Sequence, residues 1–184
     1  MKGMFFPTKF GNFILNADKD GNLLLIYKEI RNTLPVLVRI HSRCTTGDVF
    51  QSLRCDCGEQ LKKSIEIIKK EGAGIILYLD QEGRGIGLAN KIKTYKLQDK
   101  GFDTVEANHQ LGFKSDMRTY SIASRILKKM GIRRIKLITN NPKKIEGLEK
   151  NGIEIVERIP LVMKPNKHNK NYLKTKKERM GHFL

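Results

Sequence analysis

The stretch GIILYLDQEGRGIG, residues 74–87, decides the predicted fold. Its first seven residues form a short apolar run of the kind expected for a strand buried in a sheet. The glycine-rich second half predicts a turn, and a helix is expected over 88–100, closed by Gly101. Apolar residues recur at helical spacing over 61–68, so a second helix precedes the strand.

The same alternation continues towards the C-terminus. Ser115 is a suitable N-cap for a helix through Met130, and the run RIKLIT at 134–139 predicts a strand. Pro142 fits the first position of the next helix, and the run IEIVE at 153–157 predicts a further strand. Repeated alternation of strand and helix indicates an α/β sheet layered with helices.

The N-terminal portion, residues 5–41, reads as short strands separated by turns. The fold class expected is therefore α/β, with a layered mixed β-sheet flanked by helices and an N-terminal strand-rich portion. Residues 1–184 are expected to form a single domain. The segment at about 165–184 is strongly basic and has few apolar anchors, which favours a mobile or loosely docked tail.

The composition is that of an ordinary globular chain, with 39% hydrophobic residues. No apolar run approaches the roughly 20 residues of a membrane span, so no membrane partner is expected. The N-terminus lacks the continuous apolar stretch and the cleavage site of a signal peptide. We therefore expect a soluble cytoplasmic protein.

The net charge of +17 indicates a polyanionic partner. Nucleic acid and a nucleoside triphosphate are both candidates. The alternative is that most of the lysines are simply solvated surface residues.

The three cysteines lie within fourteen residues, as Cys44-x10-Cys55-x-Cys57. An odd number in so tight a cluster argues against a disulfide framework and favours a metal site, for which zinc suits thiolates. In a structural site, His41 would be the fourth ligand; in a catalytic site, a water would be. Spacing alone leaves both open, together with a third interpretation in which the thiols bind no metal. Three thiolates weaken zinc as a Lewis acid, so a nearby cation is expected, with Arg39, Arg43 and Arg54 close in sequence.

Two predicted strand-to-helix turns have the chemistry of phosphate sites. In the turn at 81–87, glycines expose main-chain N–H groups and Arg84 can grip two phosphate oxygens. In the turn at 139–144, a hydroxyl, amides and two ammonium groups follow a strand. A plain tight turn and an Asn-capped helix with solvated lysines are the alternatives.

Three longer motifs resemble the GTP cyclohydrolase II family. They are RIHSRCTTGDVFQSLRCDCGEQL at 39–61, DQEGRGIGLANKIKTYKLQDKGFDTVEANHQLGF at 80–113, and LITNNPKKI at 137–145, followed by GIEIVERIPL. The resemblance runs from about Gly11 to Leu184. Some members of the family carry dihydroxybutanone phosphate synthase as a preceding domain, and this chain is expected to be monofunctional.

The resemblance implies an enzyme of riboflavin biosynthesis. The family reaction hydrolyses GTP to 2,5-diamino-6-(5-phospho-ribosylamino)pyrimidin-4(3H)-one, formate and pyrophosphate. It uses Zn²⁺, with Mg²⁺ on the triphosphate, and the enzymes are homodimers. No nucleic acid takes part.

The resemblance also implies site residues. The zinc ligands would be Cys44, Cys55 and Cys57. Tyr95 would assist ring opening, Asp116 would be the proton acceptor, and Arg118 the proposed nucleophile at the α-phosphate. The GTP site would be lined by Arg39, Ile40, His41, Ser42, Arg43, Gln60, Glu82, Gly83, Arg84, Thr104, Thr139 and Lys144.

Physical chemistry favours some of these roles over others. Arginine stays protonated, with a pKa above about 12, and then has no lone pair to attack phosphorus, so electrostatic stabilisation is the simpler role for Arg118. Guanine offers N–H donors that suit a carboxylate, for which Glu82 and Glu106 are candidates. Arg43 departs from the family pattern, which usually has Glu immediately before the first cysteine.

Two other functions stay open on the sequence. One is a related enzyme that stops at the formamide product, or an inactive paralogue. The other is a zinc-containing nucleic-acid-binding protein, for which the sequence lacks paired zinc-finger ligands and aromatic-rich basic strands.

Overall fold

The computed structural model describes residues 3–30 and 35–184. The chain forms two compact units, each assembled from three separate segments. The first, called here the sheet unit, consists of residues 1–41, 61–80 and 119–161. The second, called the cysteine unit, consists of residues 42–60, 81–118 and 162–184. The segments alternate along the chain, so neither unit is one continuous stretch of sequence.

The sheet unit is built on a seven-stranded sheet in the described part of the chain, with the order β1-β2-β3-β5-β4-β6-β7. The strands are β1 Met4–Thr8, β2 Gly11–Ala17, β3 Leu23–Tyr27, β4 Val36–Ser42, β5 Gly74–Leu79, β6 Arg134–Ile138 and β7 Glu154–Ile159. The pairs β1–β2, β2–β3 and β3–β5 are antiparallel, whereas β4–β6 and β6–β7 are parallel. The predicted mixed α/β sheet with a strand-rich N-terminal portion is confirmed, although residues 31–34 of that portion lie outside the described residues.

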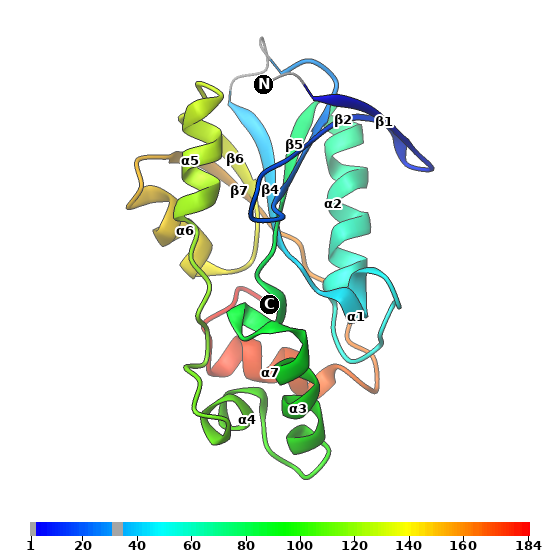
Figure 1. Ribbon diagram of the computed structural model, residues 1–184, viewed down its shortest axis with the longest axis vertical. Helices are drawn as coiled ribbons and strands as arrows, with labels where there is room; N and C mark the ends of the chain where they lie inside the picture. The colour runs from blue at the N-terminus through cyan, green and yellow to red at the C-terminus, as the bar shows by residue number, and fades with distance from the viewer. Residues whose placement is uncertain (1–2, 31–34) are drawn as a thin grey trace. The chain divides into compact units, whose positions relative to one another are not determined.

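Helices cover both faces of this sheet (Figure 1). Helices α5, Ser121–Lys129, and α6, Pro142–Glu149, pack on one face, and α2, Cys57–Glu71, lies along the other. Alternate residues of β5 divide between the faces: Ile75, Leu77 and Leu79 join the apolar core under α5 and α6, while Ile76 is buried outside that cluster. Strand β5 is therefore buried on both sides, which explains its uninterrupted apolar run.

The cysteine unit is mostly helical within the described residues. Its elements are α1 Thr45–Asp48, the first turn of α2, the 3₁₀ turn η1 Glu82–Gly85, α3 Gly87–Gln98, α4 Thr104–Gln110 and α7 Lys170–Glu178. The glycine-rich turn and the helix after it are as predicted, although the turn is a short 3₁₀ helix.

The segment 102–120 differs from expectation. Helix α4 is not among the predicted helices, although Asp103 and Glu106 form a capping box at its start, a recognisable sequence signal. The helix expected from Ser115 begins only at Ser121.

Main-chain hydrogen bonds explain the late start of α5. The N–H of Met117 donates to the carbonyl of Arg84 at 3.0 Å, and the Asp116 carboxylate accepts the N–H two residues further on at 3.1 Å. These amides are satisfied outside a helix, so a helical turn at Asp116 has no advantage.

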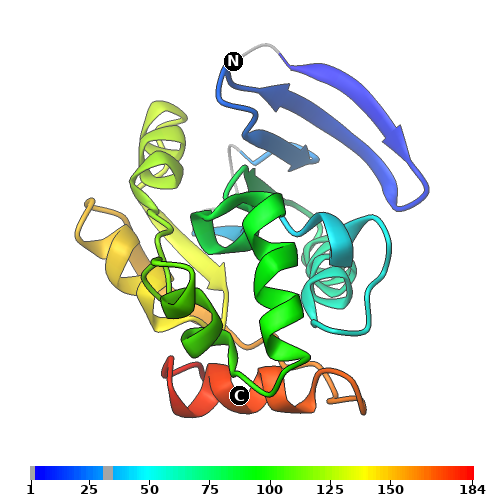
Figure 2. The same ribbon diagram turned by 60° about the horizontal axis from the view of Figure 1, so that its bottom comes forward.

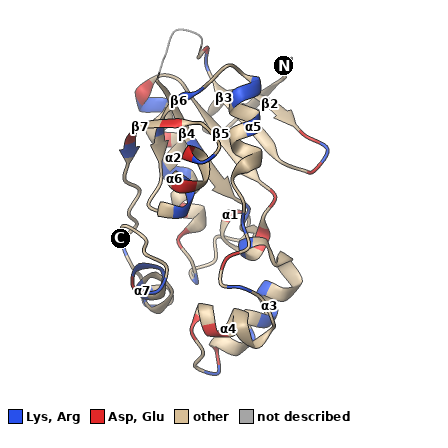
Figure 3. Ribbon diagram, turned by 90° about the vertical axis from the view of Figure 1, so that its left-hand side faces the viewer, with Lys and Arg blue, Asp and Glu red and all other residues tan. Residues whose placement is uncertain are grey.

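The basic C-terminal segment, for which a mobile or loosely docked tail is expected over about 165–184, contains a helix, and its mobility stays a prediction. Residues Lys170–Glu178 form α7, in which Leu173 and Lys176 are buried. Figure 2 shows α7 running beside α4, and the ribbon in Figure 3 marks the basic residues of α7 in blue. Among the described residues, no helix is both long and apolar enough to cross a membrane.

Candidate metal and nucleotide site

Three thiols gather in the cysteine unit. Cys44 directly precedes α1, Cys55 lies in the loop that follows, and Cys57 opens α2. Their Sγ atoms all lie within 4.8 Å of one another, and those of Cys44 and Cys55 are 3.7 Å apart. Zn–S bonds of about 2.3 Å in a tetrahedral site place sulfurs about 3.8 Å apart, so the spacing fits zinc. Within residues 3–30 and 35–184 no other group of three or more such ligands occurs.

Glycine makes this close approach possible. A Cβ on Gly47 would lie 2.9 Å from the Cys55 Sγ and 3.1 Å from the Cys44 Sγ. A Cβ on Gly58 would collide with the main-chain carbonyl of Gly47. The two turns that carry the thiols are therefore packed backbone against backbone, which holds the sulfurs at metal-binding distance.

A buried lysine that the sequence analysis did not identify contacts the cluster. The Lys91 Nζ lies 3.1 Å from the Cys44 Sγ and donates to Thr46 Oγ1 and Glu82 Oε1, each at 2.8 Å. The sequence predicts this cation among the arginines close to the cysteines, Arg39, Arg43 and Arg54. The only sequence signal for Lys91 is its position one helical turn before Tyr95 on α3.

The pKa values of the three thiols are shifted in different directions. Hydrogen bonds from Cys55 and Cys57 hold the pKa of the Cys44 thiol far below its usual range, with help from the charge of Lys91. The hydrogen bond with Cys44 raises the pKa of Cys55 to about 11. Hydrogen bonds with Cys44 and Cys55 raise the pKa of Cys57 as well. Cys44 is therefore the thiolate that Lys91 faces.

The pKa of Lys91 itself is raised. Burial alone would lower this pKa, but the Cys44 thiolate and the hydrogen bond to Glu82 raise it above its ordinary value. Lys91 is thus a fixed positive charge beside the sulfur cluster.

Tyr95 lies next to this cluster. Its hydroxyl is 3.3 Å from Thr46 Oγ1, which is itself 3.7 Å from the Cys44 Sγ. Burial raises the pKa of the Tyr95 phenol, so it is a proton donor at neutral pH. Arg54 stacks above the Tyr95 ring, with its Cζ 5.0 Å from the ring centroid, and pairs with Asp99.

Glu82 joins the loop after Cys44 to the glycine-rich turn. Its Oε2 accepts the main-chain N–H of Thr45 at 2.6 Å, and its Oε1 accepts from Lys91 and from the N–H of Gly83. Glu106, the other candidate for contacting guanine, caps its own helix by accepting the N–H of Asp103 at 2.9 Å. Both carboxylates thus have main-chain partners within the cysteine unit, and their contact with guanine stays a prediction.

Arg84 has a strained backbone and buried, unsatisfied nitrogens. Its φ is 62°, in the left-handed region that side chains other than glycine seldom adopt. Both Nη atoms are buried without a hydrogen-bond partner, and Cζ lies 5.7 Å from the centroid of the Tyr172 ring. Buried guanidinium donors of this kind suit an anionic ligand.

Asp116 and Arg118 form a tight buried pair. The Asp116 carboxylate accepts from Arg118 Nε at 2.9 Å and Nη2 at 2.7 Å. Burial alone would raise the pKa of the Asp116 carboxyl, but the hydrogen bonds and charge of Arg118 hold this pKa below its usual value, and Arg84 adds to the effect. Arg84 and Arg118 therefore both act on the Asp116 carboxylate, next to η1.

The remaining predicted residues of the cysteine unit have simpler surroundings. Gln60 donates from Nε2 to Asp56 Oδ2 at 2.6 Å, and Arg43 is exposed and donates to Thr45 Oγ1 at 3.2 Å. Ser42 is the last residue of β4, and Thr104 is the first of α4.

The other predicted GTP contacts belong to the sheet unit. They gather where the parallel strands β4 and β6 end: Arg39 Nη1 donates to the carbonyl of Ile138 at 3.1 Å, and Lys144 Nζ donates to the carbonyl of Ile40 at 2.6 Å. His41 stacks on Tyr78 with the ring centroids 5.4 Å apart.

Thr139 belongs to this group as well, since its Oγ1 accepts the N–H of Asn141, the residue that caps α6. The carboxyl ends of parallel strands are the expected ligand edge of an α/β sheet.

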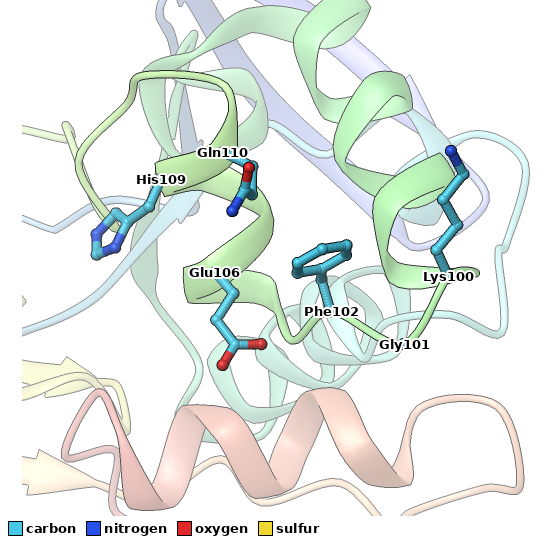
Figure 4. Close-up of a pocket in the computed structure, with 6 residues that line it drawn as sticks. All are labelled: Lys100, Gly101, Phe102, Glu106, His109 and Gln110. Atoms are coloured by element: carbon cyan, nitrogen blue, oxygen red, sulfur yellow. The ribbon is translucent and has the colours of Figure 1, made fainter.

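A surface hollow lies elsewhere in the cysteine unit (Figure 4). It is lined by Lys100, Gly101, Phe102, Glu106, His109 and Gln110. Apart from Glu106, none of these is a predicted site residue. The hollow is therefore a weaker candidate for the functional site than the residues around the thiols.

Comparisons with known proteins identify a matching family and several relatives. The profile of the family described as GTP cyclohydrolase II matches residues 3–160. The riboflavin biosynthesis protein RibBA of Chlorobium phaeovibrioides is 54% identical over 97% of this chain and 45% of its own length. RibBA proteins of Endomicrobium trichonymphae and Aquifex aeolicus are each 52% identical, with the same coverage. The chain spans about half the length of these curated relatives.

Proposed function

The chain belongs to the GTP cyclohydrolase II family, and from this premise we propose that it hydrolyses GTP to 2,5-diamino-6-(5-phospho-ribosylamino)pyrimidin-4(3H)-one, formate and pyrophosphate. This would be the first committed step of riboflavin biosynthesis. The observation that carries the proposal is the cysteine cluster, whose sulfurs lie at zinc-binding spacing with a lysine and a tyrosine beside them.

The three thiols would hold zinc as Cys44, Cys55 and Cys57. When bound, the ion supplies Lewis-acid activation of a water for attack at C8 of guanine. Three thiolates and one Zn²⁺ sum to −1, and the Lys91 ammonium at 3.1 Å from the Cys44 Sγ offsets that charge. The cation that the sequence analysis expected near the metal would thus be Lys91.

Tyr95 would donate a proton to a departing ring nitrogen. Burial keeps the phenol protonated, and Thr46 fixes the position of its oxygen. A phenol that is neutral at pH 7 can act only as a donor at the start of such a step. Its placement near the thiols supports this role over simple packing of an aromatic ring.

Arg84 and Arg118 would bind phosphate oxygens. The unsatisfied Nη atoms of Arg84 support this role directly. The fork that joins Arg118 to Asp116 supports electrostatic stabilisation by Arg118, because a guanidinium held by a carboxylate of lowered pKa keeps its protons. Asp116 would then orient Arg118, and a role as proton acceptor would require it to leave that fork.

The magnesium ion, the remaining GTP contacts and the oligomeric state also belong to the proposal. Mg²⁺ would be bound largely by the triphosphate oxygens. Contacts with GTP are proposed for the remaining predicted residues, including those at the ends of β4 and β6. A homodimer, a cytoplasmic location and the absence of nucleic-acid and membrane partners stay predictions.

The test is to incubate zinc-loaded protein with GTP and Mg²⁺ and to measure formate and pyrophosphate. Equal amounts of both are expected. Formate at background level, with one zinc per chain confirmed, would exclude the proposed reaction, and pyrophosphate alone would indicate a reaction that stops at the formamide. For Arg118, the variant Arg118→Ala removes every side-chain nitrogen, so residual pyrophosphate release would rule out a covalent role.

A further inference from the structure

A buried ion pair joins the C-terminal helix to the turn between two cysteines. Asp56 lies between Cys55 and Cys57, is 1% exposed, and accepts from Lys176 Nζ on both oxygens, at 3.0 and 3.1 Å. Lys176 is also buried, although it stands in the basic run KTKK that suggests a solvated tail. Two buried charges at this spacing compensate each other, and the loss of either would leave the other unpaired.

Asp56 also organises the start of α2. Its carbonyl accepts the main-chain N–H of Gln60 at 2.9 Å, and its Oδ2 accepts Gln60 Nε2 at 2.6 Å. Cys57 is the first residue of that helix. The position of the Asp56 carboxylate therefore sets the direction of the turn that carries the second and third thiols.

Helix α7 contacts the glycine-rich turn that carries Arg84 as well. The ring of Tyr172, one helical turn before Lys176, lies 5.2 Å from Lys176 Nζ and 5.7 Å from Arg84 Cζ. At the other end of α7, Arg179 pairs with Asp103 and, at 3.5 Å, with Glu106 of the α4 capping box. These contacts hold α7 along the cysteine unit, beyond the residues 3–160 that the family profile matches.

We propose that Lys176 is a positioning residue that holds the Cys55–Cys57 turn in its metal-binding geometry. The inference rests on the proposed zinc site. Lys91 and Lys176 place one ammonium on the Cys44 side of the cluster and one at the turn between the other two thiols. Groups that orient metal ligands from outside the coordination shell typically change metal affinity by about 10–100-fold when they are removed.

The experiment compares full-length variants for zinc affinity, by competition with a chromophoric chelator. Lys176→Met should weaken zinc binding about 10–100-fold, whereas Lys177→Met, at the exposed neighbouring position, should bind as the wild type does. Lys176→Arg should restore most of the affinity. A Co²⁺-substituted Lys176→Met protein should also show an altered thiolate-to-metal absorption band, which a change in stability alone would not produce.

The double variant Asp56→Asn/Lys176→Met separates positioning from the cost of an unpaired charge. It should still bind zinc weakly, and it serves as the readout if Lys176→Met fails to fold. Wild-type zinc affinity in the double variant, or in a folded Lys176→Met protein, would overturn the inference. Wild-type protein that binds zinc and releases no formate would instead refute the proposed reaction and leave the positioning role standing.

Discussion

The two units of this protein differ in where the apolar core cluster and the lysine–carboxylate pairs lie. The apolar core cluster lies entirely in the sheet unit, on the strands, on α5 and α6 and in the turns next to them. The cysteine unit buries charges in pairs: Lys91 with Glu82, and Lys176 with Asp56. Apolar packing tolerates exchange among hydrophobic residues, whereas a buried ion pair fails when one partner is lost. The contrast indicates a scaffold of general stability and a second unit whose geometry is fixed by paired charges.

The largest expected loss of stability comes from breaking a charge pair of the cysteine unit. Lys91→Met leaves the Glu82 carboxylate buried without its cation, so cysteine-unit amides should lose about 3–5 kcal/mol of protection in native-state hydrogen exchange. Lys93→Met, at an exposed position of α3, is the matched control. Equal protection in the two variants would show that the pair does not stabilise the unit.

Truncation of a side chain in the apolar core should destabilise the sheet unit. Leu127→Ala removes a fully buried side chain from α5 and should cost about 2–5 kcal/mol in urea unfolding. Zinc affinity should stay at the wild-type value, because the thiols belong to the other unit. The exposed neighbour Lys129→Ala should change neither quantity. A large loss of zinc affinity in Leu127→Ala would contradict the contrast between the units.

The Asp116–Arg118 pair should make stability depend on pH. The folded pKa of Asp116 lies below its unfolded value of about 3.9, so its contribution is fully present above that pH and is lost as the pH falls through the folded pKa. At pH 7, Asp116→Asn should be less stable than the wild type by about 1–3 kcal/mol. Urea unfolding as a function of pH should show this difference vanish in acid, while the deficit of Leu127→Ala persists. A pH-independent deficit in Asp116→Asn would exclude the carboxylate as its source.

The smallest effect is expected at the capping box of α4. Asp103→Ala removes the acceptor for the N–H groups of Val105 and Glu106 and should cost about 0.5–2 kcal/mol. Hydrogen exchange of the α4 amides measures this cost. Gln110→Ala, at the exposed end of the same helix, should leave these amides unchanged.

The predictability of the two units from sequence follows the same contrast. Apolar periodicity predicts the strands and α2, because the local pattern of apolar residues indicates that Ile75, Leu77 and Leu79 are buried. Cysteine spacing predicts a metal cluster, because ligands close in sequence stay close in space. The partners of Lys91 and Lys176 are not predictable in this way. A buried lysine looks like a solvated one in sequence, and Lys176 is 120 positions from Asp56.

The segment around Asp116 shows a second limit. Ser115 has the residue type of an N-cap, but the N–H groups after it are satisfied by Arg84 and by the Asp116 side chain. Such competition depends on contacts distant in sequence, so a local helix signal cannot anticipate it.

The most direct test of the account is hydrogen exchange with and without one equivalent of zinc. Metal binding stabilises the part of a protein that supplies the ligands. Zinc should therefore raise protection over residues 43–60 and 81–98, which carry the thiols and Lys91, and leave the amides of β4 and β6 unchanged. Zinc-dependent protection in the sheet strands, or none around the three cysteines, would contradict the claim that the cysteine unit holds the metal.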